Sequence, residues 1–161
     1  MLPDEPRRIA TAAQMRNGWS PNLANRQRRM SGFRSHLPPE GCPSEEAVLA
    51  NGDFFRLVNQ SPADTSDFLS LAEQNKPCPP TACPCEWSGI SLCRSRADIQ
   101  VVLKLRGRNR NAKIAQGKLS PAMGVTQDTP RPKIPSHVTY WPYATAEPWL
   151  VFQIEEPKSD E

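Results

Sequence analysis

The chain has 161 residues, a net charge of +3 and a mean hydropathy of −0.61. Hydrophobic residues make up 37% of it and 18 residues are proline, so we expect one packed core built from short elements. There is no run of about 18 apolar residues, which argues against a membrane-spanning helix, and no apolar segment follows the arginine-rich start, which argues against a secretory signal. These features predict a cytoplasmic protein without a membrane partner.

The five cysteines are an odd number in a chain long enough to fold without disulfides, which predicts reduced thiols. Cys78, Cys83, Cys85 and Cys93 follow the spacing C-x4-C-x-C-x7-C. Structural zinc sites use C-x2-4-C knuckles in pairs, so we expect a proline-stiffened loop with idle thiols and no metal site. Zinc binding is the less favoured alternative.

The composition divides the chain into three parts. Residues 1–43 are predicted to form a basic, flexible arm, residues 44–157 a single α+β domain, and residues 158–161 an acidic tail. Few aliphatic side chains accompany the arginines of the arm, which are Arg7, Arg8, Arg16, Arg26, Arg28, Arg29 and Arg34. Such an arm either contacts nucleic-acid phosphates or is simply a solvated terminus.

In the first half of the domain, Ser44 is placed to cap a short helix over residues 44–49. The apolar run 53–58 lies between turn-forming residues and predicts a buried strand from which Arg56 projects. A second helix is expected to follow and to end before Lys76, which precedes a proline.

Residues 89–93 form a second predicted strand. Ser95, with Asp98 three residues later, resembles a capping box and predicts a helix over residues 95–105. The apolar positions there also alternate as in a strand, and we favour the helix. Residues 112–116 are predicted to add a helical turn.

A basic segment covers this helix and the loop after it, with Asp98 as its one acidic residue. Its members are Arg94, Arg96, Lys104, Arg106, Arg108, Arg110, Lys113 and Lys118. Within it we predict that Arg106, Arg108 and Arg110 contact phosphate, because they would be carried on a folded body. The alternative is an ordinary solvated loop.

The C-terminal third is predicted to form strands at 123–126, 138–141 and 149–155. Apolar residues occupy both faces of the last strand, which predicts a central place in the sheet. The expected fold is therefore α+β, loop-rich and proline-rich, with a mixed or antiparallel sheet and two or three helices.

The segment SHVTYW at residues 136–141 is the main candidate site. Alternation along a strand places His137, Thr139 and Trp141 on one face and Val138 and Tyr140 on the other. We predict that His137 acts as a general acid or base or binds a ligand, that Thr139 lies beside it, and that Tyr140 or Trp141 stacks on a base. A core histidine bonded to a backbone carbonyl is the alternative.

Two resemblances follow from these motifs. The order FFRLV, GISLC, GKLSPAMGV, SHVTYW and WLVF resembles a family of small bacterial proteins of uncharacterised activity, over about residues 52–154. More distantly, Arg56, Ser91 and a late acid, Glu155 or Glu156, are similar to the R-S-E arrangement of ADP-ribosyltransferases, although Ser91 does not stand in an S-T-S run. This second resemblance implies an NAD-dependent toxin or effector with Arg56, Ser91, His137 and Glu155 as catalytic residues.

The function we predict is binding of a nucleotide or nucleic acid through the basic patch and the histidine and aromatic pocket. The enzymatic alternative is the ADP-ribosyltransferase, whose cofactor is NAD. The other alternative is a non-enzymatic subunit that docks a protein partner through its acidic tail and proline loops.

Overall fold

The computed structural model describes residues 32–34, 41–106 and 111–156. In this part of the chain one antiparallel sheet of seven strands has the order β1-β5-β6-β3-β2-β4-β7. The strands are β1 (Val48–Leu49), β2 (Gly52–Val58), β3 (Ile90–Cys93), β4 (Lys113–Leu119), β5 (Gly124–Asp128), β6 (His137–Pro142) and β7 (Phe152–Ile154). The α+β class and the antiparallel sheet are confirmed.

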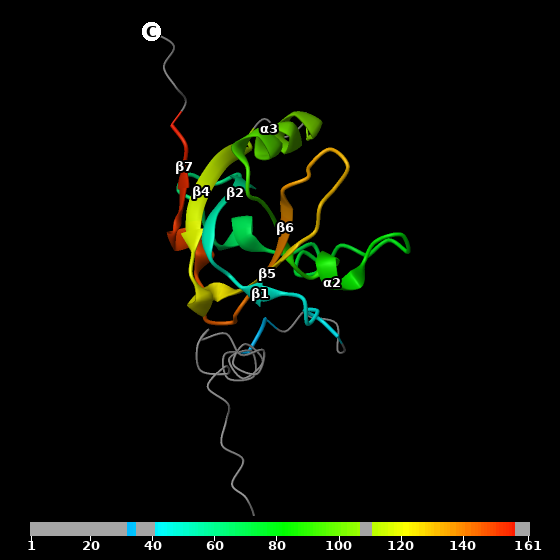
Figure 1. Ribbon diagram of the computed structural model, residues 1–161. Coiled ribbons are helices and arrows are strands. Elements are labelled where there is room, and N and C mark those ends of the chain that lie inside the picture. The colour runs from blue at the N-terminus through cyan, green and yellow to red at the C-terminus, as the bar shows by residue number, and fades with distance from the viewer. Residues whose placement is uncertain (1–31, 35–40, 107–110, 157–161) are drawn as a thin grey trace, which may run out of the picture.

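Helices are few and short in the described segments. The α-helices there are α2 (Pro84–Trp87) and α3 (Arg96–Leu105), and the 3-10 helices are η2 (Thr65–Phe68), η3 (Pro121–Met123) and η4 (Pro148–Leu150). Figure 1 shows the sheet curving round, with β7, β4 and β2 on one side, β5 and β6 on the other, and α3 beyond one end of the strands. None of the described helices has both the length and the apolar character needed to cross a membrane.

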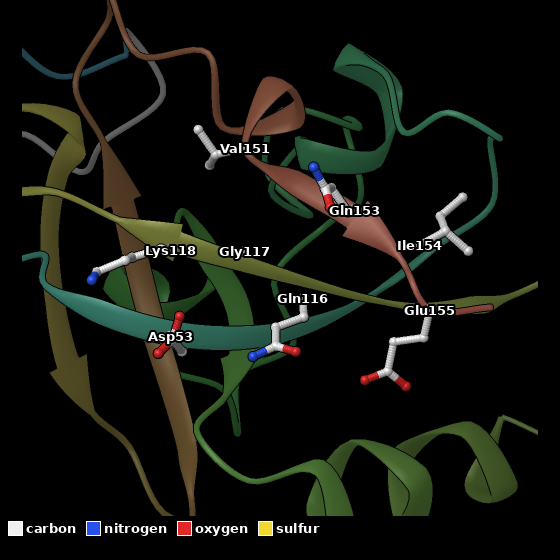
Figure 2. A pocket seen from close by; sticks show the side chains of 8 residues that line it. All are labelled: Asp53, Gln116, Gly117, Lys118, Val151, Gln153, Ile154 and Glu155. Carbon is white, nitrogen blue, oxygen red and sulfur yellow. The ribbon is translucent and has the colours of Figure 1, made fainter. Parts of the chain in front are cut away.

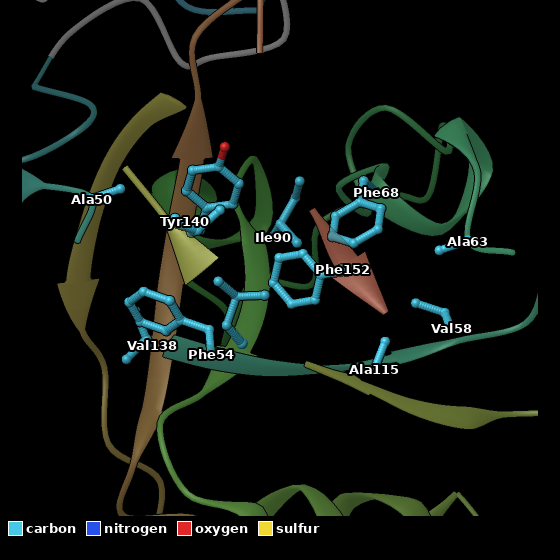
Figure 3. Close-up of a cluster of buried hydrophobic side chains, with 12 residues drawn as sticks. Ala50, Phe54, Val58, Ala63, Phe68, Ile90, Ala115, Val138, Tyr140 and Phe152 are labelled. Carbon is cyan, nitrogen blue, oxygen red and sulfur yellow. The ribbon is translucent and has the colours of Figure 1, made fainter. Parts of the chain in front are cut away.

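The main core fills one face of this curved sheet (Figure 3). Phe54, Ile90 and Tyr140 come from three neighbouring strands and are almost completely buried. Phe68 from η2 packs on Phe152 from β7 with ring centroids 5.0 Å apart. Burying each such side chain contributes about 1.5–3 kcal/mol, so these rings hold the short elements together.

A second, smaller core lies around Trp141, which packs with Ala47, Val125 and Tyr143. Phe33 packs against the same cluster, and its ring lies 5.2 Å from that of Tyr143. The body of the protein therefore includes contacts from residues that precede position 44.

Strands β2 and β3 are neighbours in the sheet, but they are paired at one position only and diverge beyond it. Their register contains the single pair Phe55 and Cys93, whereas β2 pairs with β4 along its whole length from Gly52 to Val58. The chain thus opens the sheet on one side of β2. This separation produces the largest concave surface described below.

Five predicted elements are confirmed, namely the strands at 53–58, 89–93, 123–126 and 138–141 and the helix after Ser95. The Ser95 side chain accepts a hydrogen bond from the backbone N–H of Asp98 at 3.0 Å. A satisfied N-cap fixes the start of α3 and explains why the helix, and not the alternating strand, forms here.

Two helix predictions are wrong because sheet pairing replaces the local preference. Residues 44–49 form a turn followed by β1, and the Ser44 hydroxyl bonds to Gln127 at 2.9 Å instead of capping a helix. Residues 112–116 belong mainly to β4, where Ala115 pairs with Arg56 on one side and Ile154 on the other.

The expected second helix is only partly present. It forms the 3-10 helix η2, capped by Asp64, and turns follow instead of further helix. The strand predicted at 149–155 is present only as β7, and its predicted central place in the sheet is wrong. Its first part is η4, and β7 lies at the edge of the sheet, bonded to β4 alone. Proline at the start of η4 favours the helical turn there.

Candidate functional site

Two cavities meet where β2 and β3 separate, and together we call them the arginine groove. The inner pocket has a volume of about 200 Å³ and the outer groove about 780 Å³. Five residues belong to the lining of both cavities, namely Arg56, Leu57, Ser91, Arg106 and Arg131. Three guanidinium groups therefore stand at the junction of the two cavities.

Arg56 is held in place by the backbone on both sides of the opening. Its Nε donates to the carbonyl oxygen of Asp67 at 2.6 Å and its Nη1 donates to that of Ser91 at 2.8 Å. The guanidinium also lies 5.4 Å from the ring centroid of Phe68. Burial and the nearby charge of Arg106 lower the pKa of Arg56 to about 10, so it remains protonated at neutral pH.

Arg131 reaches the groove from the loop before β6. It donates to the Glu86 carboxylate of α2, and its charge also lowers the pKa of His137. Arg106 thus lowers the pKa of Arg56, and Arg131 lowers that of His137. The repulsion between Arg56 and Arg106 is relieved when an anion binds beside them.

The inner pocket combines apolar walls with a histidine. The walls include Leu92, Ile99, Val102 and Ile134. Cys93 is also part of the lining, and burial together with Asp98 raises the pKa of its thiol to about 11. The thiol is therefore protonated at neutral pH and is a poor nucleophile.

His137 has one ring nitrogen fixed by Thr129. Its Nδ1 lies 3.0 Å from the Thr129 carbonyl oxygen and 2.8 Å from the Thr129 hydroxyl, which in turn bonds to Thr139 at 2.8 Å. A carbonyl oxygen only accepts, so Nδ1 carries the hydrogen and Nε2 keeps a lone pair. Burial, followed by the charge of Arg131, lowers the pKa of His137 and favours this neutral form.

The loop that carries Arg131 and leads to His137 at the start of β6 is bonded to α3. The Asp98 carboxylate accepts from the Ser136 backbone N–H at 2.8 Å, and the Ser136 hydroxyl accepts from the Ser95 backbone N–H at 3.1 Å. Bonds to Ser136 lower the pKa of Asp98. Hydrogen bonds therefore join α3 to the loop before β6, and residues of both line the inner pocket.

The outer groove is bounded by α2 and the cysteine-rich loop. The indole Nε1 of Trp87 donates to the Lys76 carbonyl oxygen at 2.9 Å, which orients an aromatic ring in the groove wall.

Helix α2 is attached to the preceding chain by a disulfide between Cys42 and Cys85. The prediction of reduced thiols is wrong for this pair, because folding brings two cysteines together that are 43 positions apart. Cys78, Cys83 and Cys93 are free thiols.

Tyr140 and Trp141 do not line the groove, which corrects the predicted aromatic pocket. Their relative exposures are 0% and 1%. The Tyr140 hydroxyl donates to the Met123 carbonyl oxygen at 2.8 Å and the Trp141 Nε1 donates to that of Cys85 at 3.0 Å. Thr139 is buried as well. The predicted alternation is right, but both faces of β6 are covered at these positions.

Glu155 lies apart from Arg56, Ser91 and His137. It lines a different pocket beside β4 and β7, in which Figure 2 shows it below Ile154 and near Gln116. Its carboxylate pairs with Arg96 of α3 at 2.8 Å. The four residues implied by the transferase resemblance therefore do not meet at one site, although Arg56, Ser91 and His137 all line the inner pocket.

Arg106 lines the groove as part of the predicted patch, whereas Arg108 and Arg110 lie outside the described residues. Sequence reasoning missed Arg131, Glu86 and Trp87, since each comes from a loop or short helix without a motif. The one signal for Arg131 was its place in a polar loop just before the candidate segment.

No family model, curated protein or solved structure matches the chain.

Proposed function

We propose that the arginine groove binds a phosphorylated ligand, either a nucleotide or a nucleic acid. The observation that carries this proposal is the lining shared by the two cavities, in which Arg56, Arg106 and Arg131 stand together. Guanidinium groups match phosphate oxygens in charge and in the geometry of their N–H groups. An anion at the junction would contact the inner pocket and the outer groove at once.

The electrostatics support the same ligand class. The lining of the outer groove has four basic side chains, Arg56, Lys76, Arg106 and Arg131, against two acidic ones, Asp67 and Glu86. Asp67 accepts backbone N–H groups of Asn59, Gln60 and Asp64, so its charge is already used within the fold. The surplus of positive charge faces the cavity and attracts phosphate.

The size and lining of the groove suit a nucleotide unit better than an isolated phosphate ion. Apolar walls adjoin the arginines in the inner pocket, and the Trp87 ring adjoins them in the outer groove. Bases stack on aromatic faces while cationic side chains follow the backbone. Trp87 thus takes the role that the sequence suggested for Tyr140 and Trp141.

Binding is tested with a fluorescein-labelled single-stranded oligonucleotide, whose anisotropy is measured over a series of salt concentrations. We expect affinity to fall steeply with salt. Arg106→Ala and Arg131→Ala should each weaken binding about tenfold and reduce the slope of log K against log salt by about one. The matched control is Arg96→Ala, which removes an arginine of α3 that pairs with Glu155 outside the groove.

The result decides between the groove and the arginine-rich start of the chain. If Arg106→Ala and Arg131→Ala bind like Arg96→Ala, the groove is not the binding site. A salt-independent affinity would remove phosphate recognition altogether.

NAD is a second candidate ligand, because Arg56 and Ser91, two residues of the transferase resemblance, line the same groove and Arg56 bonds to the Ser91 backbone carbonyl. Glu155 is remote, so Glu86 is the groove carboxylate to examine. Transfer of label from NAD to cell extract that is abolished by Glu86→Gln and retained by Glu155→Gln would support this alternative. Absence of transfer by the wild type would remove it.

A further inference from the structure

His137 has the arrangement of a general base beside a phosphate site. Thr129 holds its Nδ1–H, so the lone pair is on Nε2, the opposite edge of the ring. Since His137 lines the inner pocket and Nδ1 points to Thr129, the Nε2 edge is the part of the ring available to a bound ligand. The Thr129 to Thr139 bond keeps this orientation fixed.

The protonation state suits this role. Burial and Arg131 both lower the pKa of His137, so the imidazole is neutral at pH 7 and ready to accept a proton. The charged groups that act on it from the packed elements are Arg131, which lowers the pKa, and Glu86, which raises it less. A general base must be unprotonated before it reacts.

The pocket offers the histidine no strong protein nucleophile. The Cys93 thiol has a pKa of about 11 and is protonated. In the β3 and β6 register Cys93 is opposite His137, whereas Ser91 is opposite Thr139, so the serine is offset from the histidine by two residues. The hydroxyl that His137 activates would then belong to the ligand.

RNA is a phosphorylated ligand of this kind, because its 2′-hydroxyl lies next to a phosphodiester. We propose that the arginine groove cleaves single-stranded RNA, with His137 as the general base. This inference rests on the proposed function, because the phosphate must first be held by the arginines. Single-stranded RNA is favoured because an unpaired base is free to enter the inner pocket or stack on Trp87.

In this reaction the 2′-oxygen transfers its proton to Nε2 of His137 and forms a bond to the adjacent phosphorus. The bond from phosphorus to the 5′-oxygen of the next nucleotide breaks, and that oxygen takes a proton from water. The imidazolium then returns its proton to solvent. The products are a 2′,3′-cyclic phosphate and a 5′-hydroxyl, and Arg106 and Arg131 stabilise the charge that develops on the phosphoryl oxygens.

The experiment uses the full chain with a fluorescein-labelled single-stranded RNA and with the same sequence made of 2′-O-methyl nucleotides. We expect cleavage of the RNA alone, with 2′,3′-cyclic phosphate ends identified by mass spectrometry. His137→Gln should slow cleavage by about 10²- to 10⁴-fold while the affinity for the 2′-O-methyl strand is unchanged. The rate of the wild type should rise with pH and level off below neutrality.

His36→Gln is the matched control, because His36 is the other histidine of the chain, and it should cleave like the wild type. Arg131→Ala provides a second test if His137→Gln does not fold, since the Arg131 side chain is 47% exposed, and this variant should also cleave more slowly. Cleavage by His137→Gln at the wild-type rate would overturn the inference, as would intact RNA at saturating protein. Failure to bind the 2′-O-methyl strand would overturn the proposed binding of nucleic acid, on which this inference rests.

Discussion

Arg56 donates a hydrogen bond from Nη1 to the carbonyl oxygen of Ser91 at 2.8 Å, just beyond the single register pair of β2 and β3. The Arg56 side chain thus supplies a hydrogen-bond donor to a backbone carbonyl of β3 at the point where β2 and β3 are no longer paired. The same guanidinium lines both cavities of the groove. One residue therefore bridges the two separated strands and lines the candidate site.

Replacing Arg56 with Met should lower the free energy of unfolding by about 3 kcal/mol, because two charge-assisted hydrogen bonds to backbone carbonyls are lost. Urea denaturation followed by circular dichroism measures the change. Arg96→Met is the control and should lose less than about 1 kcal/mol, since its ion pair with Glu155 is partly exposed. Equal losses in the two variants would contradict a structural role for Arg56.

Acid should destabilise the protein through His137. Its pKa in the folded state is below the ordinary value, so between the two values the unfolded chain binds more protons and stability falls as the pH is lowered. The fall begins near pH 6.5 and amounts to at most about 1.4 kcal/mol per pH unit. Unfolding of the wild type and His137→Gln at several pH values measures it. An identical pH dependence in both proteins would show that His137 is not responsible.

Two predictions follow from the disulfide between Cys42 and Cys85, one on the number of free thiols and one on stability. Thiol titration of the denatured protein without reductant should find three of the five cysteines free. Cys42→Ser should lower the free energy of unfolding by about 2–4 kcal/mol, because the unfolded chain is no longer crosslinked. Cys78→Ser, at an exposed free thiol, should change it by less than about 0.5 kcal/mol. Five free thiols would show that the bond does not form.

Gly89 should not tolerate a side chain. A Cβ there would contact the Thr139 methyl group and lie 3.0 Å from the Trp141 Nε1, both in buried side chains. Gly89→Ala should therefore destabilise the protein by about 1–3 kcal/mol in thermal or urea unfolding. Ser120→Ala, at an exposed position without a side-chain capping bond, should have an effect within about 0.5 kcal/mol. Similar stability of both variants would contradict the tight packing over β6.

Local signals in the sequence were reliable where they did not depend on distant segments. The Ser95 cap, the strand that contains Arg56 and the alternation after His137 follow from side-chain hydrogen bonding and from the period of a strand, which act over a few residues. The same reasoning failed for residues 112–116, because a backbone with weak preferences adopts the conformation that its neighbouring strands can bond.

The sequence by itself determined that the chain has an apolar core of strands, that His137 and Trp141 share a face, and that arginines are concentrated near α3. Only the tertiary structure decided which of these side chains meet solvent. Tyr140 and Trp141 are covered because burying their large apolar rings stabilises the fold. Arg56 and Arg131 line a cavity and have hydrogen-bond or ion-pair partners, because a guanidinium is costly to bury without them. The groove exists because β2 and β3 separate, and that separation depends on pairings between segments far apart in the chain.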